Sequence, residues 1–137
     1  MAAEPERSQL RAVAHAVLRA EAGAVGLGRL CPRCGSSVHG RPVARTGSGG
    51  PLQVSISYTA GLVAVAWSRT SRVGVDVERD GPPVDGLDRR GFTRAEALFK
   101  AGGGMPTREL DLPDGYVGTL AGVDVSWRLA GPAAPAG

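Results

Sequence analysis

The stretch from residue 52 to residue 77 restricts the fold most, because it reads as three consecutive β-strands. Apolar and polar side chains alternate over residues 52–58, which is typical of a strand with one buried face. Residues 59–61, Thr-Ala-Gly, suit a tight turn, and the apolar run at 62–67 fits a partner strand. Residues 73–77, Val-Gly-Val-Asp-Val, form the third. The sequence therefore predicts a β-hairpin followed by a further strand.

Helices are expected on both sides of these strands. Residues 8–22 carry apolar side chains on one helical face, with Ser8 as the N-cap and Gly23 as the stop. A second helix is expected at about 93–101, where three consecutive glycines end it. The last strand is expected at 123–129.

Glycine and proline mark the parts of the chain that are expected to lack regular structure. The chain of 137 residues contains 21 Gly and 10 Pro. Residues 23–51 should be mainly loop and residues 80–91 a linker. The order helix, hairpin, strand, helix, strand predicts an α+β fold in a single domain over 1–137, made of an N-terminal helix and loop part (1–51), a core that holds the motifs (52–129) and a tail expected to fray (130–137).

The composition argues against a membrane span and favours a cytoplasmic protein. No run approaches the roughly 18 apolar residues that a spanning helix needs, and the first residues, Met-Ala-Ala-Glu-Pro-Glu, lack the order of a secretory signal. Two cysteines three positions apart make no disulfide framework, so a reducing compartment is expected. The net charge of +3 favours an acidic partner, whereas dispersed arginines and scarce aromatic residues do not favour nucleic acid.

Two acidic residues lie at alternate positions of the third strand. If Val73, Val75 and Val77 point to the core, Asp76 and Glu78 project together from the other face. Two carboxylates on one face can serve as half of a site for a hard cation such as Mg²⁺. The alternative is a solvated edge strand with ordinary surface charges.

The expected second helix places Glu96 and Lys100 on one face, four residues apart. A carboxylate one turn before an ammonium can hold a metal or take a proton, while the ammonium neutralises a phosphate. The alternative is structural, with Thr93 and Glu96 as a capping box and a surface ion pair between Glu96 and Lys100. In the functional account, the side chains expected to enter the core are those of Phe92, Ala95, Leu98 and Phe99.

Cys31 and Cys34 have the spacing of a zinc knuckle. A structural zinc site needs four ligands, and His39 is the one further ligand nearby. This pair is therefore weak support for zinc.

Two further segments place polar groups at turns. Arg41 belongs to a Gly-Arg-Pro turn that precedes a glycine-rich segment, an arrangement that suits a phosphate. Ser57 and Tyr58 carry hydroxyls where a strand meets a turn, and such groups donate to phosphate or stabilise the turn itself.

The order of these segments is more specific than any one of them. It resembles the 4′-phosphopantetheinyl transferase superfamily, in particular the surfactin-synthetase-activating type, over about residues 39–101. The resemblance implies that family's fold, an antiparallel sheet with packed helices, in a short and divergent member whose first half is reduced. It also implies Mg²⁺-dependent transfer of 4′-phosphopantetheine from coenzyme A to a serine of an apo acyl or peptidyl carrier protein, by a monomer or a homodimer.

The resemblance assigns roles to single residues. It makes Asp76, Glu78 and Glu96 the Mg²⁺ ligands, with Glu96 or its water as the base that deprotonates the serine. Lys100 would stabilise the diphosphate and the leaving group. The coenzyme A contacts would be Arg41, Ser57, Tyr58 and Lys100.

The chain departs from the family pattern at several positions. Tyr58 stands where the family usually has His, Ala95 replaces a common Lys, and Phe92 replaces a Trp. Two alternatives therefore stay open. One is a catalytically impaired relative that binds coenzyme A or a carrier protein without transfer, and the other is a small structural or interaction domain with zinc at Cys31 and Cys34.

Overall fold

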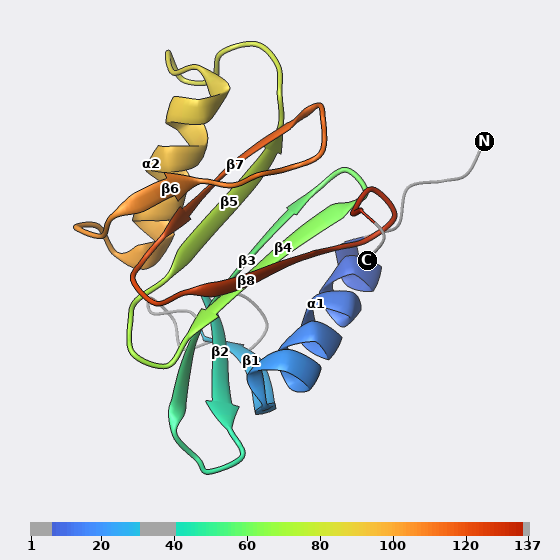
Figure 1. Cartoon of the computed structure of the whole chain (residues 1–137), viewed down its shortest axis with the longest axis vertical. Helices are drawn as coiled ribbons and strands as arrows, with labels where there is room; N and C mark the ends of the chain where they lie inside the picture. Colours follow the sequence, from blue (N-terminus) through green and yellow to red (C-terminus); the bar gives the residue numbers. More distant parts are fainter. Residues whose placement is uncertain (1–6, 31–40, 136–137) are drawn as a thin grey trace.

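The computed structural model describes residues 7–30 and 41–135. Its strands form two antiparallel sheets, one in the order β1-β2-β3-β4-β8 and one in the order β5-β7-β6. The helices cover the outer faces of the two sheets, α1 on the first and α2 on the second, so the α+β class is confirmed (Figure 1). The elements are α1 (Arg7–Ala22), β1 (Ala24–Leu30), β2 (Arg41–Thr46), β3 (Pro51–Thr59), β4 (Leu62–Ser68), β5 (Gly74–Arg79), α2 (Arg89–Ala101), β6 (Thr107–Glu109), β7 (Tyr116–Ala121) and β8 (Ser126–Ala130).

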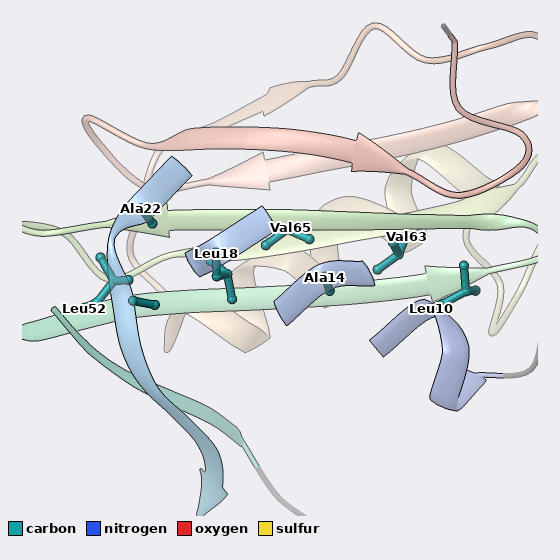
Figure 2. Close-up of a cluster of buried hydrophobic side chains, with 8 residues drawn as sticks. Leu10, Ala14, Leu18, Ala22, Leu52, Val63 and Val65 are labelled. Atoms are coloured by element: carbon teal, nitrogen blue, oxygen red, sulfur yellow. The ribbon is translucent and has the colours of Figure 1, made fainter. Parts of the chain in front are cut away.

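The first helix packs on the five-stranded sheet through residues spaced four apart. Leu10, Ala14, Leu18 and Ala22 are buried and form one stripe that faces β3 and β4 (Figure 2). Because α1 begins at Arg7, the predicted N-cap, Ser8, lies inside its first turn. The predicted stop is confirmed, since α1 ends at Ala22 and the next residue, a glycine, has a φ of 70°. Neither described helix is long and apolar enough to cross a membrane.

Strand β4 is buried on both faces and separates the two cores. Val63 and Val65 pack against α1, whereas Ala64 and Ala66 face the second sheet. The predicted hairpin is confirmed, because β4 pairs with β3 in antiparallel register. The small alanine side chains leave room for the valines of β5 to pack on β4.

The polar face of β3 is buried as well, which the alternation alone did not predict. Ser55 and Ser57 accept hydrogen bonds from the backbone amides of Val75 and Val77, each at 3.0 Å. These serine hydroxyls therefore occupy the edge of β5 that has no strand partner in its own sheet. The alternation in β3 reflects two different buried surroundings, one apolar under α1 and one polar against β5.

Two parts of the chain that were expected to be irregular contain strands. The prediction of mainly loop over residues 23–51 is wrong for its described residues, because β1 and β2 form a hairpin. Leu27 and Ala44 pair across this hairpin and pack against the α1 core, which compensates for the weak strand propensity of its glycines. The strands β6 and β7 were not predicted, and the last strand begins at Ser126, after a turn in which Asp124 has a φ of 53°.

The second helix begins four residues earlier than expected. Asp88 is its N-cap and accepts a hydrogen bond from the Gly91 amide at 2.7 Å, so the predicted capping box at Thr93 is wrong. The Thr93 hydroxyl is instead buried, within hydrogen-bond distance of the hydroxyl of Thr119 on β7. Gly102, with a φ of 85°, ends the helix as predicted.

Candidate functional site

The site forms where α2 lies directly on the start of β5. A methyl group added at Gly74 would lie 1.9 Å from the carbonyl oxygen of Ala97, so the two backbones touch there. The buried face of α2 is accordingly made of small residues, Thr93, Ala97 and Ala101. This requirement explains why two of the expected core residues are not buried, since Ala95 is exposed and Phe99 is 74% exposed.

Lys100 in the last turn of α2 reaches across β5 to its buried carboxylate. Its Nζ donates to the carbonyl oxygen of Val75 at 2.9 Å and lies 3.5 Å from Asp76 Oδ1. A third contact joins Nζ to the carbonyl oxygen of Ile56 on β3 at 3.4 Å. Among the described ion pairs this one takes the place of the predicted surface pair with Glu96.

Asp76 is only 5% exposed, because α2 covers the face of β5 that was expected to meet solvent or ligand. The prediction that Val73, Val75 and Val77 enter the core is confirmed, and the solvated edge strand is wrong for Asp76. Ser57 Oγ lies 3.3 Å from Asp76 Oδ1, whereas Oδ2 has no hydrogen-bond partner among the described residues. One oxygen of this buried carboxylate is therefore unpaired within the described part of the chain.

Burial raises the pKa of the Asp76 carboxyl from its ordinary value of 3.8 to about 7, and the charge of Lys100 opposes this rise. The negative charges of Glu78 and Glu96 raise the pKa of Asp76 further. The three predicted acidic residues thus lie close enough to interact through their charges. Near neutral pH, Asp76 can take up or release a proton when the local charge changes.

The three carboxylates nevertheless do not form a closed coordination shell. Glu78 at the end of β5 and Glu96 on α2 are both half-buried. Within residues 7–30 and 41–135, no three His, Cys, Asp or Glu side chains are grouped closely enough to hold a metal ion. Because Mg²⁺ usually takes only one or two carboxylates and fills its other positions with water and phosphate, this donor set suits Mg²⁺ in chemistry and charge.

A cleft of about 580 Å³ lies beside this carboxylate group, with Lys100 and Tyr58 in its lining. The lining also includes Arg7, Arg72 and Phe99. No aspartate or glutamate belongs to the described lining, so its formal charges are all positive. The cleft suits an anionic ligand that is apolar in part.

The predicted coenzyme A contacts do not all reach this cleft. Tyr58 lines it, and the Arg7 guanidinium carbon lies 4.6 Å from the centroid of the Tyr58 ring. Ser57 is not among the lining residues, because its hydroxyl is engaged by β5. Arg41 lies at the start of β2 rather than in a turn. The residues of the possible zinc site, Cys31, Cys34 and His39, lie outside the described part of the chain.

Arg7, Arg72 and Phe99 are among the cleft residues that sequence reasoning did not assign to a site. Arg7 shares one helical stripe with Arg11 and His15, at intervals of four residues, and this spacing was the available signal. Nothing in the sequence around Arg72 distinguishes it from the other arginines.

The charged groups that the site brings together are the carboxylate of Asp76 and the ammonium of Lys100. They lie next to each other, because Lys100 contacts Asp76 and also lines the cleft. Comparison of the chain with protein-family models, curated proteins and solved structures finds no match.

Proposed function

We propose that the protein is a Mg²⁺-dependent 4′-phosphopantetheinyl transferase that acts in the cytoplasm on an apo acyl or peptidyl carrier protein. The observation that supports this proposal is the contact between Lys100 and the buried Asp76 at the edge of a cationic cleft. Phosphoryl transfer needs mainly positioning and charge neutralisation, which this group of residues supplies.

In the proposed reaction, the serine hydroxyl of the carrier protein attacks the phosphorus of coenzyme A that bears pantetheine. A phosphorus–oxygen bond forms to the serine, and the bond to adenosine 3′,5′-bisphosphate breaks. Glu96, or a water that it holds, takes the serine proton, and Lys100 stabilises the negative charge of the leaving group. Asp76, Glu78 and Glu96 would hold Mg²⁺, which when bound neutralises charge on the diphosphate.

One observation favours a second candidate, a relative that binds coenzyme A without transfer. Lys100 is engaged by Asp76 and two backbone carbonyls, and the three carboxylates are not grouped closely enough for a metal in the described residues. On this second reading, the protein binds an anion at the cleft, and its described residues contain no assembled metal centre.

Intact-mass spectrometry of an apo carrier protein with coenzyme A and Mg²⁺ separates the two candidates. The proposal predicts a mass gain of one phosphopantetheine with the wild type and none with Glu96→Gln. Glu109→Gln is the matched control, because Glu109 is an exposed surface partner of Arg90, and this variant should transfer normally. A wild type that binds coenzyme A but modifies no carrier protein favours the binding-only relative.

A further inference from the structure

The cleft lies along an edge of β3 rather than over one of its faces. Its lining includes Gln53, Val54, Ser55, Ile56 and Tyr58, which are nearly consecutive along this strand. Val54 and Ile56 pack toward the α1 core, whereas the Ser55 hydroxyl bonds to β5. Because successive side chains of a strand point to opposite faces, a cleft that contacts both sets meets the strand at its edge.

The neighbouring strand β2 leaves this edge soon after the two strands meet. In the described chain β2 pairs with β3 at two positions, and the pair farther along β3 joins Ala44 to Leu52. The same register would place Pro42 opposite Val54, but proline has no N–H group to continue the ladder. Pro42 instead lines the cleft and stays paired with β1. Beyond Leu52, β3 therefore has β4 as its one ladder partner among the described residues.

Three residues of β3 direct their backbone N–H and C=O groups toward this open edge. The Ile56 carbonyl oxygen lies 3.4 Å from Lys100 Nζ, so it points toward α2 and away from β4. Backbone groups alternate between the two edges along an antiparallel strand, which gives those of Val54 and Tyr58 the same direction. Within residues 7–30 and 41–135, the N–H groups of these three residues have no ladder partner. Such an edge is a template for pairing with another extended chain.

The side chains around this edge determine which kind of chain fits it. Arg7, Arg72 and Lys100 carry the formal charges of the described lining, which contains no aspartate or glutamate. Phe99 adds an aromatic ring that is 74% exposed. An extended peptide with acidic side chains complements these charges, and apolar side chains between the acidic ones can cover the ring.

We propose that the cleft binds an extended, acidic segment of a partner protein, which joins the edge of β3 as an added strand. The main chain of this segment pairs with the backbone of Val54, Ile56 and Tyr58, and its carboxylates contact the arginines of the cleft. This site needs neither a metal nor coenzyme A, so it does not depend on the proposed transfer.

Amide hydrogen exchange of the full chain, measured by NMR at single residues, tests both the open edge and the added strand. The probe is a pentapeptide of alternating glutamate and valine with blocked ends, in EDTA and without coenzyme A. Before the peptide is added, the amides of Val54, Ile56 and Tyr58 should exchange at least about tenfold faster than those of Ser55 and Ser57, which belong to the ladder with β4. Saturating peptide should slow the three edge amides at least about tenfold and leave the two serine amides unchanged.

Matched peptides and a pair of variants identify the contacts. An added strand turns alternate amides toward β3, so N-methylation of the peptide either at its valines or at its central glutamate should abolish binding, and the other N-methylated peptide should still bind. A peptide with lysine in place of glutamate should not bind. Arg7→Gln should raise the Kd at least about threefold, whereas Arg108→Gln, a change at an exposed arginine of β6 outside the cleft, should leave it unchanged.

Several results would overturn the proposal. Edge amides that are as protected as the serine amides before peptide is added would show that the edge is already paired. Absent binding, or equal binding of the two N-methylated peptides, would exclude an added strand. Equal effects of Arg7→Gln and Arg108→Gln would place the peptide elsewhere. The expected pattern in a protein that modifies no carrier protein supports the added strand and overturns only the transfer.

Discussion

Replacing Asp76 by Asn should stabilise the protein at alkaline pH and change its stability little in acid. Asp76 is buried with a pKa of about 7, whereas the same carboxyl in the unfolded chain has the ordinary value of 3.8. The folded state therefore keeps the proton on Asp76 at pH values where the unfolded chain has released it. The stabilisation from this raised pKa is fully present below pH 3.8 and is lost as the pH rises toward 7.

The size of the effect follows from the difference between the two pKa values. At about 1.4 kcal/mol per pKa unit, ionised Asp76 lowers the free energy of unfolding by up to roughly 4 kcal/mol at pH 8. About 2 to 3 kcal/mol of this loss should occur between pH 5 and pH 8, because the unfolded chain is already ionised at pH 5. Asn keeps the shape of the side chain and carries no charge at either pH, so Asp76→Asn removes this loss.

Urea unfolding of wild type and Asp76→Asn at pH 5, 6, 7 and 8, in EDTA, measures the effect. The stability difference between the two proteins should change by about 2 to 3 kcal/mol in favour of the variant across this range. Asp111→Asn, at an exposed carboxylate between β6 and β7, is the control and should follow the wild-type profile. A stability difference between wild type and Asp76→Asn that stays constant from pH 5 to pH 8 would refute the reasoning.

Three further predictions concern the contacts that hold the site together. Gly74→Ala forces a methyl group into the backbone of α2 and should cost at least about 3 kcal/mol in urea unfolding, whereas Gly26→Ala, which meets nothing within 4 Å, should cost under about 1 kcal/mol. Ser57→Ala leaves a buried backbone amide of β5 without its acceptor and should lower the free energy of unfolding by about 1 to 3 kcal/mol. An unchanged free energy of unfolding would mean that water replaces the lost hydroxyl. Lys100→Met should lower the free energy of unfolding of the wild type more at pH 8 than at pH 5, because Asp76 then loses its charged partner. In the Asp76→Asn background the same substitution should have no such pH dependence. An equal loss of stability at both pH values in the wild type would show that the ion pair contributes nothing.

The parts of the fold that were predicted correctly are those where local pattern and tertiary packing agree. The stripe of α1 and the β3–β4 hairpin each combine a regular spacing of apolar residues with a glycine at the boundary. The paired strands β1 and β2 were not predicted, because their glycines are typical of loops. Packing under α1 stabilises this strand pair. Tertiary contacts outweigh propensity in such segments, and the sequence alone does not contain them.

In the site, too, local pattern predicted some features, whereas others depended on tertiary packing. Alternation along β5 correctly placed Asp76 on the face opposite the valines, but it did not predict that α2 covers that face. The approach of α2 depends on Gly74, whose significance appears only when the neighbouring backbone is known. Spacing along one element therefore predicted which side chains share a face, whereas burial and charge depended on the element packed against it.

The position of Asp76 carries the strongest argument for a function at this site. An ionised carboxylate with one unpaired oxygen, buried against α2, lowers stability at neutral pH, and an asparagine of the same shape would not. A carboxylate in this position has a physical rationale if a bound cation or another positively charged group compensates its negative charge when the protein functions. Lys100 supplies part of that charge, and the other carboxylate oxygen has no hydrogen-bond partner in residues 7–30 and 41–135. Magnesium should therefore stabilise the wild type more at pH 8 than at pH 5.5 in thermal unfolding and leave Asp76→Asn unaffected, and an equal shift of both proteins would place the ion elsewhere.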